Sequence, residues 1–166
     1  TEMAIQEILS DAEIDLGIRW NGGHFLPSGA PLLDDKLVND ALGILVDKNY
    51  NAILLPFRKG LDHFLHSSKK PELLTDTVTD MYEALEALAK QVTGKDKDLS
   101  GNAELFISKL DVSGEYKDML KSYILYANGL RHAPARGRQK PSPSRPEVES
   151  FIYITGIFTR LAVGHS

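Results

Sequence analysis

Residues 71–94 have the sequence PELLTDTVTDMYEALEALAKQVTG. Apolar side chains recur in it every three or four residues over about five turns, which is the spacing of one buried helix face. They are Leu74, Val78, Met81, Tyr82, Leu85, Leu88, Ala89 and Val92. Proline is favoured at the first position of a helix and glycine just after its end, so Pro71 and Gly94 mark the expected limits. This stretch predicts a long amphipathic helix.

Helical spacing continues on the N-terminal side of this helix. Either Asp34 or Asp35 is a suitable N-cap for a helix whose apolar residues extend to Val46, and a further helical run is expected to end near His66. The asparagine-rich stretch at residues 49–51 predicts the break between the two helices. These segments extend the expectation of an all-α bundle.

Three further helices are expected after Gly94. A short one covers residues 105–110, and Ser113 opens another that ends near His132. The last covers residues 148–163 and is apolar on most sides, so we expect it to be deeply packed. Residues 144–147 precede it with the spacing of a capping box.

The N-terminal part of the chain has a different character. Residues 3–16 fit one helix face, but the stretch that follows is rich in glycine and proline, and its pair Asn21-Gly22 is typical of a tight turn. We expect a loop or a short hairpin there, carrying the single tryptophan. The sequence is therefore divided into an N-terminal helix and Trp-bearing loop (1–33) and a helical bundle (34–166).

Composition limits the function classes. A chain of 166 residues fits one domain of ordinary size. The absence of cysteine excludes disulfides and thiolate metal sites and agrees with a cytoplasmic location. No apolar run is long enough to cross a membrane, and no leader peptide is recognisable. We therefore expect neither a membrane partner nor a cofactor.

Positive charge is concentrated between Asp118 and Glu147, where six basic residues occur and no acidic ones. They are Lys121, Arg131, Arg136, Arg138, Lys140 and Arg145. The whole chain has a net charge of -4, so the remainder sums to -10. A compact basic segment in an acidic protein attracts phosphate, and salt screens that attraction. One interpretation is contact with an RNA backbone through Arg136, Arg138, Lys140 and Arg145, and the other is a solvated loop without a partner.

The order of these elements resembles that of HEPN domains. A long helix bearing Tyr-Glu-Ala-Leu-Glu at 82–86 is followed by a short helix, a helix ending in a polar, histidine-bearing motif, a loop and a last apolar helix. The HEPN-type modules of bacterial abortive-infection (Abi-like) systems are the most similar. The resemblance covers residues 34–163 in the order of elements and 121–163 in motif. It implies a homodimer in a bacterial defence or toxin-type system, and active members are metal-independent endoribonucleases.

The resemblance also assigns roles to residues near the end of that helix. Asn128 matches the family's polar position and His132 its histidine, while Ala127 occupies the place of the arginine. Arg131 lies one turn after Ala127 and is the cation that would replace it. A ribonuclease would then use His132 as general acid or base, Asn128 to orient it and Arg131 to stabilise phosphate charge.

The substitution at Ala127 leaves other functions open. One is a degenerate member that binds RNA, or a protein partner, without cutting. Another is a dimerisation or adaptor module attached to a catalytic domain that is missing here. In both, His132 would be a C-terminal helix residue whose charge is favoured by the helix dipole.

Three other features admit a functional interpretation. His63 and His66 are three residues apart on a predicted helix, but no third metal ligand has suitable spacing, so we expect a solvent-facing pair and no metal site. Glu83 and Glu86 are expected to be solvated carboxylates. Residues 143–146 have the spacing of a polyproline ligand, which is a weaker alternative for the basic loop.

Overall fold

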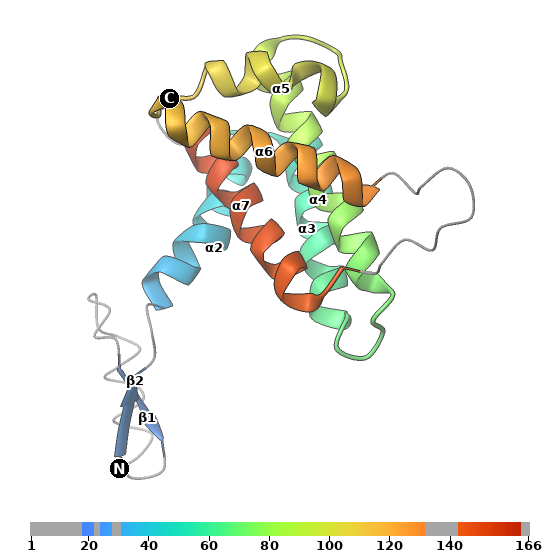
Figure 1. Ribbon diagram of the computed structural model, residues 1–166. Coiled ribbons are helices and arrows are strands. Elements are labelled where there is room, and N and C mark those ends of the chain that lie inside the picture. The colour runs from blue at the N-terminus through green and yellow to red at the C-terminus, as the bar shows by residue number, and fades with distance from the viewer. Residues whose placement is uncertain (1–17, 22–23, 28–30, 132–142, 164–166) are drawn as a thin grey trace.

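The computed structural model describes residues 18–21, 24–27, 31–131 and 143–163. Within these ranges six helices form an all-α bundle, preceded by a two-stranded hairpin (Figure 1). The all-α prediction is therefore confirmed. The elements are β1 (Ile18–Asn21), β2 (His24–Pro27), α2 (Pro31–Asp47), α3 (Asn51–His66), α4 (Leu73–Thr93), α5 (Leu99–Ser108), α6 (Gly114–Arg131) and α7 (Arg145–Val163).

The long central helix α4 organises the bundle. It packs against α3, α5, α6 and α7, while α2 packs against α7 and α3. Figure 1 shows α6 lying across α4. The apolar face predicted for α4 is buried, and Met81, Leu85 and Leu88 are fully enclosed in the common core. Sequence periodicity thus identified the helix on which the others assemble.

Two predicted helix starts were wrong. The structure begins α4 at Leu73, because Pro71 and Glu72 belong to the preceding turn. It begins α2 at Pro31, so Asp34 lies inside the helix instead of capping it. Proline has a backbone φ already suited to the first helical turn and lacks only an N–H that has no partner there. The proposed division after residue 33 therefore falls within a helix.

The predicted helix ends agree better with the structure. Gly94 adopts a left-handed φ of 68° and its N–H bonds to the Lys90 carbonyl, as expected of a C-terminal cap. Asn49 has a φ of 56° at the break between α2 and α3. The hairpin alternative is also confirmed, since Trp20 pairs with Phe25 in an antiparallel register. The helix predicted at residues 3–16 lies outside the described residues.

The capping box at the start of α7 is confirmed. The Ser144 N–H donates to Oε2 of Glu147 at 2.7 Å, and the Glu147 N–H donates to Oγ of Ser144 at 3.4 Å. Hydrogen bonds from the Ser144 hydroxyl and N–H, joined by the Tyr126 hydroxyl, hold the pKa of Glu147 below its ordinary value. The deep packing expected of α7 is also present, because Phe151 and Phe158 are fully buried.

Candidate functional site

Asn128 lies on the last turns of α6, where the family motif was expected. Its Oδ1 accepts a hydrogen bond from the Tyr82 hydroxyl of α4 at 3.0 Å. Tyr82 is buried, so this bond links the end of α6 to the centre of the bundle. Asn128 also lines a groove of about 270 Å³ between α5 and α6, together with Glu104 and Lys121. The side-chain amide oxygen of Asn128 is thus already hydrogen-bonded to a residue of α4.

Ala127 is enclosed in the core. Its exposed fraction is 0%, and it continues the buried stripe of α6 formed by Leu120 and Ile124. Residues at these spacings share one face of a helix. The position at which the resemblance to HEPN domains would place an arginine therefore faces the interior of this bundle.

Most of the predicted basic and catalytic residues fall where the structure gives no side-chain description. His132, Arg136, Arg138 and Lys140 lie outside the described residues. Arg131 is the last residue of α6, and only its backbone is described. The roles assigned to these residues remain predictions. The structure does fix the two helix ends that flank them, because α6 ends at Arg131 and α7 begins at Arg145.

Arg145 is engaged within the protein. Its guanidinium carbon lies 4.2 Å from the centre of the Phe64 ring, and Nη1 donates to Oγ of Ser67 at 2.5 Å. Stacking of a guanidinium on an aromatic face is favourable, and more so as the pair is desolvated. Arg145 therefore joins the start of α7 to the end of α3. An RNA contact by this side chain would have to form alongside these interactions.

Lys121 also has a protein partner. Its Nζ donates to Oε1 of Glu104 on α5 at 2.8 Å. This hydrogen bond raises the pKa of Lys121 and lowers the pKa of Glu104. The charge of Lys121 is thus matched locally by a carboxylate of α5.

Two tyrosines add an aromatic surface beside the basic segment. Tyr126 is 42% exposed, and its hydroxyl donates to Oε1 of Glu147 at 2.9 Å. Tyr123 packs between Tyr126 and Phe151, with ring centres 6.0 and 5.5 Å apart. With Pro146, the tyrosines line a groove of about 330 Å³ between α6 and α7. Neither tyrosine was predicted as a site residue, although aromatic residues close to basic ones in the sequence are typical of nucleic-acid binding.

A second polar cluster links α3 and α4. The Asp80 carboxylate, 3% exposed, accepts from Nζ of Lys59 at 2.8 Å and lies 2.7 Å from Nδ1 of His63. The expectation that His63 is solvent-facing was therefore wrong, since this ring is only 23% exposed and is bound to Asp80. His66 is exposed as predicted. No metal-binding group of three histidine or acidic side chains occurs among the described residues.

The comparisons with known proteins found no matching family model, no matching curated protein and no matching solved structure. None of the helices in the described ranges combines the length and apolar character needed to cross a membrane.

Proposed function

We propose that this protein is an RNA-binding helical bundle of the HEPN type, in which residues 132–144 between α6 and α7, called the basic segment from here on, hold the RNA backbone. In this proposal it forms a homodimer and does not cut RNA through the family's arginine–histidine arrangement. The proposal keeps Arg136, Arg138 and Lys140 as phosphate contacts. Asn128, Arg131 and His132 then do not form a cleavage site.

The single observation that carries this choice is the burial of Ala127. A phosphate-stabilising arginine must reach solvent, but the side chain at this position points into the core. The side-chain amide oxygen of Asn128 accepts a hydrogen bond from the Tyr82 hydroxyl. Both features favour a bundle in which position 127 serves core packing instead of catalysis.

The exposed ring of Tyr126 supports RNA as the ligand. It lies on the helix that leads into the basic segment, and its hydroxyl reaches Glu147 just after that segment. Aromatic rings stack with bases of any sequence, while neighbouring cations bind the phosphates. Stacking on Tyr126 and phosphate contacts from Arg136, Arg138 and Lys140 would together supply the two interactions that hold single-stranded RNA.

Exposed apolar side chains on α6 support the dimer. Met119 and Leu125 are both more than half exposed on this helix. They are six positions apart and therefore lie on different sides of the helix, and a partner that covers either side chain would remove apolar area from water. We expect the partner to be a second copy of the chain.

Replacing Arg136, Arg138 and Lys140 together with alanine is expected to weaken RNA binding and flatten its salt dependence. Each lost contact to a single strand removes about 0.7 from the slope of log affinity against log salt, so the slope should fall by about 2. Fluorescence anisotropy with a labelled single-stranded RNA, measured at several salt concentrations, gives this slope.

The matched control replaces three exposed lysines outside the segment, Lys95, Lys97 and Lys109, with alanine. It should leave the slope nearly unchanged. Equal effects of the two triple variants would show that RNA binds by overall charge and not through the basic segment. RNA cleavage in EDTA that disappears in His132→Ala would overturn the non-cleaving part of the proposal.

Tyr126→Ala is expected to weaken RNA binding by about 1–3 kcal/mol, because it removes one stacking platform. Tyr126→Phe keeps the ring, loses the hydrogen bond to Glu147 and should retain most of the affinity. Both variants are measured by the same anisotropy titration. A larger loss in the phenylalanine variant than in the alanine variant would contradict stacking.

A further inference from the structure

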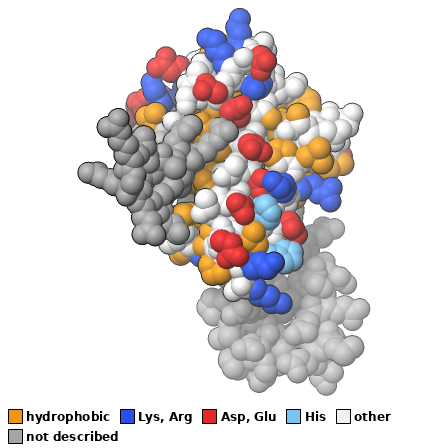
Figure 2. All heavy atoms as spheres, turned by 90° about the vertical axis from the view of Figure 1, so that its right-hand side faces the viewer, with side chains coloured by type: hydrophobic (Ala, Val, Ile, Leu, Met, Phe, Trp, Pro, Cys, Tyr) orange, Lys and Arg blue, Asp and Glu red, His pale blue; other side chains and the backbone are white. Residues whose placement is uncertain are grey.

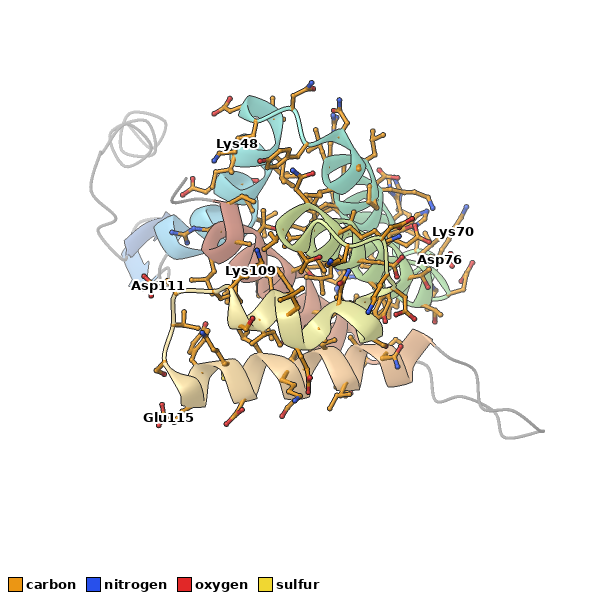
Figure 3. The ribbon with its side chains drawn as sticks, turned by 90° about the horizontal axis from the view of Figure 1, so that it is seen from above. Lys48, Lys70, Asp76, Lys109, Asp111 and Glu115 are labelled. Carbon is orange, nitrogen blue, oxygen red and sulfur yellow. The ribbon has the colours of Figure 1, made fainter. Side chains whose placement is uncertain are left out.

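The turn between α3 and α4 carries a groove that the RNA surface does not use. It has a volume of about 280 Å³ and is lined by Asp62, His63, His66, Lys69, Lys70 and Leu73. Figure 2 shows two histidine side chains close together on this face, among acidic and basic side chains. Lys70 and Asp76 lie at the same edge of the bundle in Figure 3.

We propose that this groove binds a phosphate monoester group, with His63, His66, Lys69 and Lys70 as donors and the buried Asp80 as the residue that positions His63. The ligand chemistry is that of a terminal phosphate, which carries more charge than a phosphodiester within a strand. A nucleoside monophosphate and the 5′-phosphorylated end of an RNA both present this group, and inorganic phosphate offers similar charged oxygens without the ester. The site does not depend on RNA binding by the basic segment.

Asp80 sets the orientation of His63. An ionised carboxylate only accepts hydrogen bonds, so Nδ1 of His63 must carry a proton to bond with Oδ2 at 2.7 Å. The second nitrogen of the ring, Nε2, is then the one that is left for a ligand. Because His63 lines the groove, Asp80 positions a ring that borders it, and the proposal assigns Nε2 to the ligand.

His66 is oriented in the same way by its own helix. Its Nδ1 lies 2.8 Å from the carbonyl oxygen of Asp62, which also only accepts. Nε2 is therefore also the nitrogen of this ring that is left for a ligand. When protonated, both imidazoles can donate to phosphate oxygens, and such charge-assisted bonds are about twice as strong as neutral ones.

The formal charges of the residues that line the groove sum to +1, two lysines against one aspartate. Lys69 and Lys70 outweigh the single lining carboxylate, Asp62, even before either imidazole gains a proton. Lys59 satisfies the other oxygen of Asp80, and its hydrogen bond to that carboxylate raises the pKa of Lys59. The negative charge of Asp80 is thus partly balanced by Lys59. It therefore repels an anionic ligand less than the charge of an unpaired carboxylate would.

The test is histidine-detected NMR of the whole chain during titration with inorganic phosphate, AMP and two short RNAs, one with a 5′-phosphate and one with a 5′-hydroxyl. Saturable shifts of the His63 and His66 signals with inorganic phosphate, AMP or the 5′-phosphorylated RNA would support the site. Comparing those three ligands identifies the source of the group. In the Arg136, Arg138 and Lys140 triple alanine variant, which removes the proposed backbone contacts, equal His63 and His66 shifts with the 5′-hydroxyl RNA and the 5′-phosphorylated RNA would overturn the proposal, as would the absence of shifts with all three phosphate ligands.

Two variants separate binding from structure. Lys69→Gln with Lys70→Gln should weaken phosphate binding by about tenfold or more, whereas the exposed control pair Lys95→Gln with Lys97→Gln should not. Asp80→Asn should change the tautomer-sensitive nitrogen shifts of His63 and weaken binding by a similar factor. Unchanged affinity in the Lys69/Lys70 variant would overturn the proposal whether or not Asp80→Asn folds.

Discussion

Replacing Ala127 with arginine is expected to lower the free energy of unfolding by about 3 kcal/mol or more, instead of restoring RNA cleavage. The side chain at this position is fully buried in the core. Arginine would add volume to a packed interior and would bring a charge with no partner into it. Urea unfolding followed by circular dichroism measures the loss of stability.

Ser122→Arg is the matched control, because Ser122 is exposed on the same helix. A surface substitution of this kind should change stability by less than about 0.5 kcal/mol. If Ala127→Arg folds with near-normal stability and cleaves RNA in EDTA, position 127 can present an arginine to solvent. The non-cleaving proposal would then fail at its main support.

Phe151→Ala is expected to lower the free energy of unfolding by about 3–5 kcal/mol, the usual cost of removing a buried phenylalanine ring. Phe151 is fully buried on α7, and its ring packs against Tyr123 of α6 at 5.5 Å between centres. The substitution leaves a cavity between the two helices that flank the basic segment. Differential scanning calorimetry measures the change.

Leu55→Ala is the control for apolar truncation, because Leu55 is more than half exposed on α3. Its effect should stay within about 0.5 kcal/mol. An equally small effect of Phe151→Ala would mean that the helices collapse around the lost ring. The contact between Tyr123 and Phe151 would then not hold α6 and α7 together.

The helices were largely predictable because their signals are local. Helical spacing marked α4, and the caps at Gly94 and at Ser144 with Glu147 marked element ends through contacts only a few residues apart. The same local chemistry misled at Asp34 and Pro71, where more than one residue could start a helix. Only the packed structure distinguishes between such competing starts.

The candidate sites were less predictable because their contacts are remote in sequence. Tyr82 and Asn128 are 46 positions apart, and Asp80 and His63 are 17 apart. Neither pair has the spacing of neighbours on one helix, so no periodicity links them. His63 consequently looked like a surface histidine until α4 placed a buried carboxylate beside it.

The order of residues established a cysteine-free, helix-rich chain with one basic segment near its C-terminal end, because composition and helical periodicity need no distant contact. Packing decided that Ala127 faces the core, that Arg145 rests on Phe64 and that Asp80 holds His63. Burial of apolar area is not directional, so many helix arrangements can satisfy the same pattern. The side chains brought together between helices depend on which arrangement forms.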